Sequence, residues 1–340
     1  MTDRIAIDAM GGDFGPSEIV PATANILRKH TDMAVTLIGI RDEILIEMER
    51  FNLKESERVT LLHTDEVVLM DDLPAFALKN KKNSSMRLAI DLVKNNGADA
   101  CVSAGNTGAL MAISRYVLKM LPGIDRPAIC SVIPGLEGHT HVLDLGANIN
   151  SSSDQLFQFA LMGSELTCAV ENIERPLIGL LNVGSEEIKG DDRIKQTALL
   201  LSDSHLNYIG FVEGTDIYSG NVDVIVTDGF TGNVALKASE GVSNLIGHHV
   251  KKEFSASLYG KLSAIITMPI LKKIHNKIDP RQYNGASLLG LRGIVIKSHG
   301  SADRVSFASA LEEARMEVTN NVPQRITAGL ERIQNGENIL

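Results

Sequence analysis

The stretch IAIDAMGGDFGP, residues Ile5–Pro16, decides how the rest of the chain is interpreted. It begins as a short apolar run, Ile5–Ile7, and then changes to glycines and carboxylates. A buried strand that ends in this way is how α/β proteins build the floor of a small-molecule site, because glycine lets backbone N–H groups approach an anion closely. Taken alone, the stretch is equally compatible with a tight strand-to-helix turn that binds nothing.

The composition is that of a globular protein with a sizeable core. The chain has 340 residues, 44% hydrophobic and 22% charged, with a net charge of −9 that argues against general nucleic-acid binding. No apolar run reaches the ~18 residues of a spanning helix, and the N-terminus lacks a signal-peptide pattern, so we expect a cytoplasmic protein. The three cysteines lie far apart in apolar runs and suggest neither a disulfide nor a zinc site.

Short apolar runs alternate with stretches of helical periodicity, which predicts an α/β layered fold with a largely parallel sheet. The predicted strands are Ile5–Ile7, Val35–Ile38, Ala98–Val102, Ala128–Ile133, His141–Leu145, Leu177–Leu181, Asn207–Val212, Val222–Val226 and Gly293–Lys297. The predicted helices are Ser17–Lys29, Arg41–Phe51, Ser84–Asn95, Thr107–Met120, Ser153–Glu171, Asp191–Leu201, Asn233–Lys252 and Ala302–Asn320. No linker or repeat divides the chain, so we expect two lobes that share one sheet.

Four further predicted strands end in the same kind of polar, glycine-containing loop. These loops are residues 103–108, 144–148, 182–190 and 227–233. Because the carboxyl ends of parallel strands lie on one edge of a sheet, we expect all five loops to converge on one cleft.

The best-known signatures of other sites are missing. The chain contains neither GxGxxG after the first strand nor GxxxxGK[ST], which disfavours a dinucleotide or P-loop site. It also lacks HExxH, a Cys/His cluster and GxSxG. His139 and His141 precede a predicted strand, and we expect them to be structural or exposed. We therefore expect no metal site and no cofactor.

The loops instead carry amides, hydroxyls and a few cations. Thr107 and Asn233 are placed near helix starts, where backbone N–H groups bind anions, and Lys189 lies in a loop bounded by glycines. Lysines 79, 81 and 82 together with Arg87 flank a helix start at Ser84. This equipment suits phosphate binding and oxyanion stabilisation, although a solvated basic loop explains the lysine run equally well.

The motifs together resemble the phosphate acyltransferases of bacterial phospholipid synthesis. The matching segments are IDAMGGD at 7–13, KKNSSM at 81–86, VSAGNTGAL at 102–110, LDLGAN at 143–148, Lys189-Gly190 and DGFTGN at 228–233. The resemblance implies an enzyme that converts acyl–acyl carrier protein and inorganic phosphate into acyl phosphate and free carrier protein. It also implies a fold similar to phosphotransacetylases and the isocitrate/isopropylmalate dehydrogenases. A homodimer, peripheral membrane association at the inner face of the cell membrane and a functional link to a membrane glycerol-3-phosphate acyltransferase are further expectations.

Phosphate is already a competent nucleophile at neutral pH, so the predicted site needs to hold it beside a thioester and stabilise an oxyanion. The predicted catalytic residues are Lys189 for charge neutralisation, Asn233 for an oxyanion or phosphate hydrogen bond, and Asp228 for orientation. The predicted substrate-binding residues are Asp8, Gly11, Gly12, Asp13, Ser84, Arg87, Ser103, Asn106, Thr107, Asp144 and Asn148. For each aspartate, a helix cap or a loop tie is an equally good interpretation.

Residues 250–279 differ from the rest of the chain. They carry six lysines, Lys251, Lys252, Lys261, Lys272, Lys273 and Lys277, and apolar residues at helical spacing on both sides of Met268-Pro269. Two basic amphipathic segments joined by an apolar elbow at Ile265–Ile270 are typical of an interfacial membrane contact; a helical hairpin packed in a dimer is the competing interpretation. Arg292, Lys297 and Arg304 are candidates for docking the acidic carrier protein.

We therefore predict one two-lobed α/β catalytic domain over 1–340 with a basic helical tip at 250–279. One rival is a phosphotransacetylase-like enzyme that uses acyl-CoA. A metal- and NAD-dependent decarboxylating dehydrogenase and a non-catalytic membrane scaffold are the others.

Overall fold

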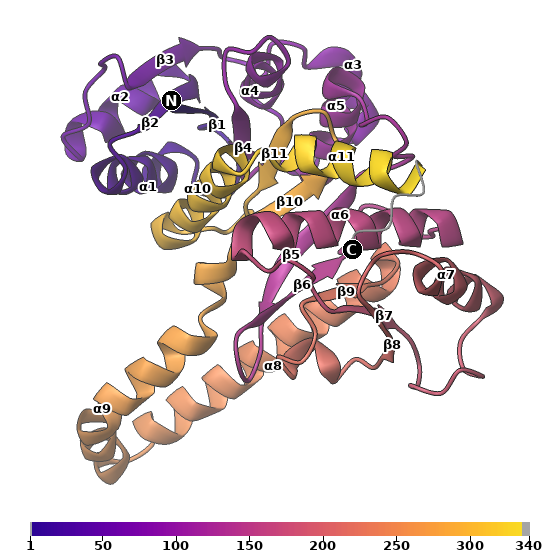
Figure 1. Ribbon diagram of the computed structural model, residues 1–340. Helices are drawn as coiled ribbons and strands as arrows, with labels where there is room; N and C mark the ends of the chain where they lie inside the picture. Colours follow the sequence, from indigo (N-terminus) through magenta and orange to yellow (C-terminus); the bar gives the residue numbers. More distant parts are fainter. Residues whose placement is uncertain (1, 335–340) are drawn as a thin grey trace.

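The computed structural model describes residues 2–334, and a single mixed sheet of eleven strands forms the centre of this part of the chain (Figure 1). The strands are β1 (Asp3–Asp8), β2 (Met33–Gly39), β3 (Val59–His63), β4 (Ala100–Ser103), β5 (Ala128–Pro134), β6 (His139–Leu143), β7 (Ile178–Leu181), β8 (Tyr208–Val212), β9 (Val224–Val226), β10 (Ala286–Leu289) and β11 (Ile294–Lys297). Their order across the sheet is β3-β2-β1-β4-β11-β10-β5-β6-β9-β7-β8.

Helices cover both faces of the sheet. They are α1 (Pro16–Lys29), α2 (Arg41–Arg50), α3 (Pro74–Asn80), α4 (Ser85–Lys94), α5 (Thr107–Leu118), α6 (Ser153–Glu171), α7 (Asp192–Ser202), α8 (Gly229–Ser255), α9 (Leu258–Ile278), α10 (Arg304–Thr319) and α11 (Val322–Gln334), with 3-10 turns at Asp216–Tyr218 (η1) and Pro280–Tyr283 (η2). The prediction of an α/β layered fold is confirmed. All nine predicted strands are present. Strands β3 and β10 and helices α3 and α11 are additional; β3, β10 and α3 are short, whereas α11 has helical periodicity that the prediction missed.

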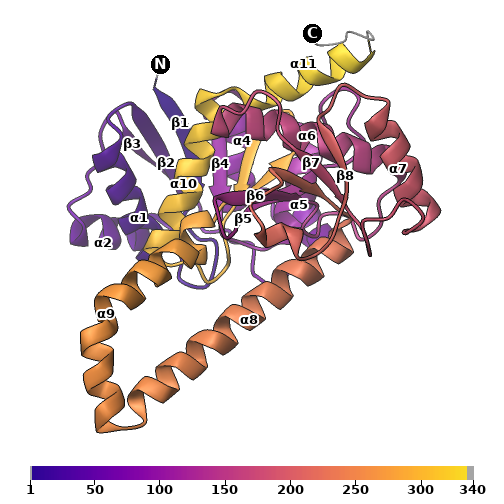
Figure 2. The same cartoon turned by 60° about the horizontal axis from the view of Figure 1, so that its bottom comes forward.

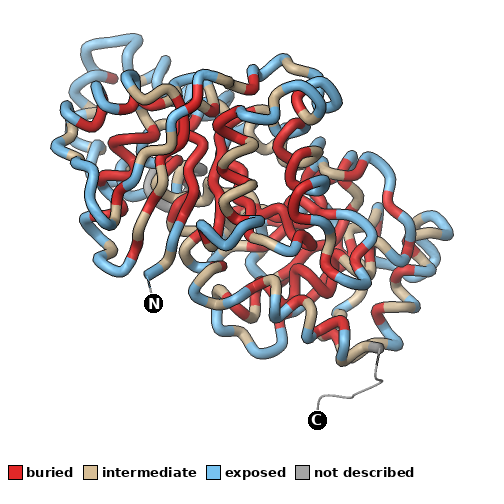
Figure 3. The backbone as a smooth tube through the Cα atoms, turned by 90° about the horizontal axis from the view of Figure 1, so that it is seen from above, coloured by how far each residue is buried: buried red, intermediate tan, exposed pale blue. Residues whose placement is uncertain are grey.

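Alternate residues of β1 enter different cores, as the two-residue period of a strand requires. Ile5 and Ile7 pack with Phe307 of α10, whereas Ala6 packs with Met86 and Leu110 on the other face. Burial on both faces makes the strand apolar throughout rather than alternating. Figure 3 shows the resulting belt of buried backbone through the middle of the molecule, with exposed segments around it.

The direction of the strands reverses within the sheet. Strands β1, β2, β3, β4 and β11 are parallel. Strand β10 is antiparallel to both β11 and β5, and β5 is antiparallel to β6, which starts a second parallel group with β9, β7 and β8. The carboxyl ends of β1, β4 and β11 therefore point in the opposite direction to those of β6, β7 and β9. The register nevertheless aligns the two sets of ends, because one row of paired residues across the sheet contains Ile7, Val102, Ile296, Leu143, Val226 and Leu180.

Helices α8 and α9 project from the body as a hairpin (Figures 1 and 2). The break between them falls at residues 256–257, where Ser257 caps α9 by accepting a hydrogen bond from the Gly260 N–H at 2.9 Å. The predicted elbow at Ile265–Ile270 is wrong, because α9 continues through Pro269. Residues 250–255 belong to α8, which starts at Gly229 rather than at the predicted Asn233. Residues 1 and 335–340 of the predicted domain lie outside the described residues, as does the side chain of Lys277 in the tip.

Among the described residues, no single helix has the length and apolarity needed to cross a bilayer. Only α8 and Leu258–Lys273 taken together meet both requirements, and they are bent by 119° relative to each other.

Candidate functional site

The predicted site residues divide between two groups of strand ends. We call residues 8–13, 103–108 and 297–300 the Gly11 edge, because they follow β1, β4 and β11. We call residues 144–148, 182–190 and 227–233 the Asn233 edge, because they follow β6, β7 and β9. The assumption that all five loops follow strands of one direction is wrong, whereas their convergence on one cleft stays a prediction.

Asp8 connects the loop after β1 to the loop after β4 through a buried hydrogen bond. Its carboxylate is buried and accepts a 2.6 Å hydrogen bond from the Ser103 hydroxyl, which itself accepts from the Gly105 N–H at 3.0 Å. Burial raises the pKa of Asp8, and the bond from Ser103 opposes that rise. Asp8 and Ser103 thus act as a buried tie, the alternative that the sequence left open for this aspartate.

Gly11 and Gly12 lie where side chains cannot fit. A Cβ on Gly11 would approach the Gly105 nitrogen to 2.7 Å, and one on Gly12, whose φ is +81°, would approach the Gly300 oxygen to 2.7 Å. The Asp13 N–H donates to the same Gly300 oxygen at 2.8 Å. The loop after β11 therefore completes this edge, and sequence reasoning missed it because no glycine-rich motif marks it.

Lys297 contributes a buried cation to the Gly11 edge. Its ammonium donates to the carbonyl oxygens of Ala104, at 3.2 Å, and of Ser298. Burial lowers the pKa of Lys297 to about 8, an effect that the nearby carboxylates of Asp8 and Asp13 partly offset. Because Lys297 is buried, the prediction that it docks a carrier protein on the surface is wrong.

Asn106 and Thr107 form the start of α5, but only one of them is exposed. The Asn106 side chain caps the helix by accepting from the Ala109 N–H at 3.0 Å and donates to the carbonyls of Met70 and Asp72, both at 2.9 Å. The Asn106 amide is therefore used within the protein. Thr107 is exposed at the first turn of the helix.

Ser84 and Arg87 belong to the start of α4 and have local partners. Ser84 is buried and caps α4 by accepting from the Arg87 N–H, while its hydroxyl donates to the Lys81 carbonyl at 2.8 Å. The Arg87 guanidinium pairs with Asp91 at 3.0 Å and lies 5.9 Å from the Tyr116 ring. These contacts direct Arg87 toward the neighbouring helices rather than toward the loops after β1 and β4.

Asp144 organises the Asn233 edge. One carboxylate oxygen accepts from the N–H groups of Ile129 and Ala147 at 2.9 and 3.0 Å. The other accepts from the backbone and side-chain nitrogens of Asn148 at 2.7 and 2.9 Å. Burial raises the pKa of Asp144, whereas these four bonds favour its ionised form. Asp144 and Asn148 are buried and hold the loop shape.

The start of α8 packs against the loop that Asp144 and Asn148 hold in shape. Asp228 caps the helix by accepting from the Thr231 N–H at 2.8 Å, and its other oxygen accepts from Arg193 at 3.0 Å. Gly229 and Gly232 let the first turn contact this loop directly, because a Cβ on Gly232 would lie 2.0 Å from the Asp144 carbonyl oxygen. The sequence analysis missed Arg193, which no motif marks.

Lys189 and Asn233 are exposed on the Asn233 edge, as are the polar residues Ser185, Glu186, Glu187 and Thr231. Asn233 lies beside Gly146, where an added Cβ would be 3.5 Å from the Asn233 Cβ. Lys189 lies in the loop between β7 and α7, and the Lys189 N–H donates to the Glu186 carbonyl at 3.0 Å. The structure thus places a lysine on the loop after β7 and an amide in the first turns of α8, which follows the neighbouring strand β9.

Helix α8 connects the two edges. It begins at the Asn233 edge and crosses the sheet face, where Ala235 and Leu236 pack with Ile129 and Val142. One turn further on, the charge of Lys237 lowers the pKa of both Lys297 and His299 on the Gly11 edge, although burial is the larger cause for each. A polar strip therefore runs along the first three turns of α8 from Asn233 to His299.

A separate group of side chains could hold a metal ion. His139, His141 and Glu171 place one potential ligand atom each within 4.8 Å of one another. Hydrogen bonding from His139 holds the pKa of Glu171 below its ordinary value. Both histidines lie within β6, rather than before a strand as predicted.

Comparison with known proteins identifies the family. The family model described as "Fatty acid synthesis protein" matches residues 3–325. The chain belongs to this family. It is 56% identical over 322 residues to a phosphate acyltransferase from Methylococcus capsulatus, which covers 95% of each chain. It is 54% identical over 333 residues to a phosphate acyltransferase from Nitrosococcus oceani, which covers 97% of each.

This membership confirms the resemblance inferred from the motifs. Among solved structures, a phosphotransacetylase from Streptococcus pyogenes matches with a TM-score of 0.60 and 16% identity over 94% of each chain. At this identity the match concerns the fold alone, and it agrees with the predicted phosphotransacetylase-like architecture.

Proposed function

We propose that this protein transfers a long-chain fatty acyl group from acyl carrier protein to inorganic phosphate. In this reaction a phosphate oxygen attacks the thioester carbonyl, a C–O bond forms and the C–S bond breaks. The proton of hydrogen phosphate ends on the carrier thiol, so acyl phosphate and free carrier protein are the products. Membership of the family and the names of its relatives support this choice.

The observation that carries the proposal is that Lys189, after β7, and Asn233, in the first turns of α8, are both exposed, while Asp144 holds the neighbouring loop from a buried position. A lysine can neutralise part of the phosphate charge, and an amide can donate to the tetrahedral oxyanion. Asp228, fixed by Arg193, orients the helix that carries Asn233. We assign Lys189 and Asn233 to catalysis, with Asp228 as a positioning residue.

Direct attack by phosphate is favoured over a covalent cysteine intermediate. The chain contains three cysteines, and burial raises the pKa of the thiols of Cys101, Cys130 and Cys168. A neutral thiol is a poor nucleophile. Phosphate carries its own negative charge and needs only to be held in place.

The Gly11 edge supplies a second set of donors for the same substrate. We infer that Thr107, at the exposed start of α5, and the backbone of Gly11 and Gly12 contact an anionic part of the substrate. Lys237 and His299 add donors beside them. The acyl–carrier substrate would then lie along the first turns of α8, which join the two edges.

Turnover of single variants tests the catalytic assignment. We expect Lys189→Ala and Asn233→Ala each to lower phosphate-dependent release of free thiol from palmitoyl–acyl carrier protein by about 10²-fold or more. Lys54→Ala, at an exposed position on a distant loop, is the matched control and should keep wild-type turnover. Unchanged turnover in folded Lys189 and Asn233 variants contradicts the assignment. Faster reaction with palmitoyl-CoA or acetyl-CoA than with the carrier protein favours the acyl-CoA alternative.

We further propose that the α8–α9 hairpin binds the inner face of the cell membrane and contributes to a homodimer. Lysines 251, 252, 261, 272 and 273 provide positive charge for anionic lipid. Large apolar side chains are exposed along both helices: Val234, Val242, Leu245, Ile246, Val250, Leu258, Tyr259, Leu262, Ile265, Ile266, Met268 and Ile270. In this arrangement the tip of the hairpin would contact the membrane, and the base of α8 would contact a second copy of the chain.

Vesicle sedimentation separates these roles. Leu262 and Ile266 are 63% and 79% exposed and one helical turn apart, so Leu262→Glu with Ile266→Glu should abolish binding to anionic vesicles. Leu136→Glu, at an 88% exposed leucine outside the hairpin, is the control. Unaltered binding of the double variant would refute the membrane contact, and sedimentation equilibrium without lipid reports the dimer independently.

A further inference from the structure

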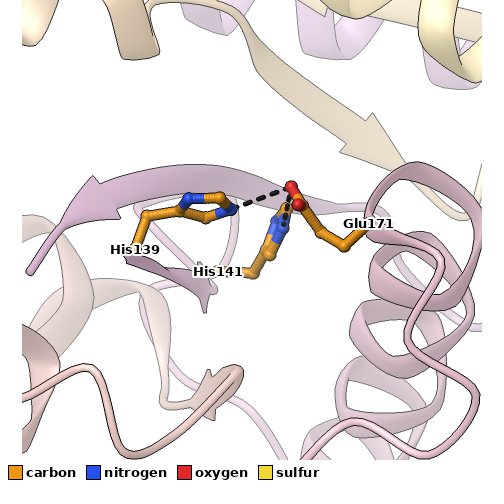
Figure 4. Close-up of side chains that lie close together, drawn as sticks. All are labelled: His139, His141 and Glu171. Atoms are coloured by element: carbon orange, nitrogen blue, oxygen red, sulfur yellow. Dashed lines mark hydrogen bonds and ion pairs between the residues drawn. The ribbon is translucent and has the colours of Figure 1, made fainter. Parts of the chain in front are cut away.

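A histidine pair and a carboxylate meet where β6 begins and α6 ends (Figure 4). His139 and His141 are two residues apart on β6, so both side chains lie on the same face of the strand. Glu171 is the last residue of α6. Figure 4 shows the two rings and the carboxylate directed toward a common point.

The spacing of the three groups suits a small cation. The His139 Nε2 lies 2.8 Å and the His141 Nε2 3.7 Å from the Glu171 Oε1. Ligand atoms around tetrahedral zinc, with bonds of ~2.0–2.1 Å, lie about 3.3 Å from each other. The two nitrogen–oxygen distances bracket this value, and the two imidazole nitrogens lie within 4.8 Å of each other.

His141 supplies an independent indication of a missing partner. Its side chain is 2% exposed, and neither ring nitrogen has a hydrogen bond to any of the residues that the structure describes. Leaving a buried polar group unpaired is unfavourable, so such groups normally have a partner. The Glu171 carboxylate lies beyond hydrogen-bond distance of His141, whereas a cation between them would bond to both.

A cavity and further carboxylates adjoin the group. A cavity of about 240 Å³ is lined by His139, Glu171, Glu312, Glu313 and Tyr283. Of the two additional glutamates, Glu312 is paired with His30 at 2.8 Å and with Lys29, so the candidate ligands remain His139, His141 and Glu171. The cavity also leaves room for a water or a small anion at an open coordination position.

We propose that His139, His141 and Glu171 bind one divalent transition-metal cation of the zinc class, with its fourth coordination position open to this cavity. Two imidazoles and one carboxylate select Zn²⁺ and its neighbours over Mg²⁺ and Ca²⁺, which prefer oxygen ligands. The bound ion would fasten the start of β6 to the end of α6. The site lies apart from Lys189 and Asn233 and does not depend on the acyltransferase proposal.

Metal binding to the full chain, produced without a histidine tag and stripped with a chelator, tests the site. We expect calorimetric titration with Zn²⁺ to give one ion per chain and an increase in Tm, because the ion binds the folded state. Replacement by Co²⁺ should give the visible absorption of a four-coordinate site. Mg²⁺ at the same concentration should neither bind nor raise Tm.

Single-ligand variants keep the test decisive. His139→Gln and Glu171→Gln change partly exposed side chains and should fold, as far-UV circular dichroism will check. Each should weaken Zn²⁺ binding by about tenfold or more. His63→Gln is the control, because His63 lies 3.6 Å from Asp65 in an exposed pair. The proposal is overturned if the wild type takes up no Zn²⁺ or if both ligand variants bind Zn²⁺ as tightly as the wild type. Loss of binding in the His63 control also overturns it.

Discussion

Replacing Asp144 by alanine should destabilise the protein strongly, because this carboxylate accepts four hydrogen bonds in a buried site. The substitution leaves the Ile129 N–H and the Asn148 N–H, in two buried residues, without their acceptor. Each orphaned donor costs about 1–3 kcal/mol, and two further bonds are lost, so the free energy of unfolding should fall by about 3–6 kcal/mol. That is a large share of the ~5–15 kcal/mol available to a folded domain.

Urea unfolding followed by far-UV circular dichroism measures this change. Asp144→Asn should lose less, because the amide oxygen can still accept from Ile129 and Ala147 while its NH₂ faces donors on Asn148. Asp203→Ala, at an exposed helix end, should stay within about 0.5 kcal/mol of the wild type. An Asp144→Ala variant within about 1 kcal/mol of the wild type would refute the view that Asp144 is the tie of this edge.

Two further predictions concern the buried lysine and the start of α8. Lys297 has a pKa of about 8 in the folded protein against an ordinary 10.5, so between these pH values the unfolded chain binds more protons than the folded protein. The contribution of Lys297 to the free energy of unfolding therefore rises with pH in this range. Relative to Lys297→Met, the wild type should gain about 2 kcal/mol between pH 8 and pH 10 in urea unfolding; parallel pH profiles would contradict this. Gly232→Ala, whose Cβ would lie 2.0 Å from a backbone oxygen, should cost about 2–3 kcal/mol, whereas Gly241→Ala, with no atom within 4 Å, should be neutral or stabilising by thermal unfolding. A Gly232 variant as stable as the Gly241 variant would disprove the close contact between α8 and the loop at Asp144.

Local sequence pattern was sufficient for most of the fold. The apolar runs at Ile5–Ile7 and Val35–Ile38 correspond to β1 and β2, because strands buried on both faces leave a continuous apolar signature. Strand β10 left no such signature: it is four residues long and takes its place through pairing with β11 and β5. The break in the hairpin was misplaced for a similar reason, since Pro269 is a local signal that the exposed helix α9 tolerates.

The candidate site was predictable by residue type but not by arrangement. The motifs contain Asp8, Asp144 and Asp228, but their structural roles depend largely on donors from other segments: the Ser103 hydroxyl, the Ile129 N–H and the Arg193 guanidinium, respectively. Arg193 and the Lys297–Gly300 segment carry no motif and became visible only through contacts across the sheet.

The sequence by itself determined the α/β class, the strand-end loops and the family, because these depend on periodicity and on residue types at fixed local spacing. Tertiary structure alone decided which loops follow strands of the same direction, since strand direction reverses through β10 and β5 without any local signal. It also decided that His139, His141 and Glu171 meet, because the close approach of β6 to the end of α6 is a product of packing. Gly11 and Gly12 therefore follow a strand that runs opposite to β6, β7 and β9, and only the register of the sheet aligns the ends of these strands.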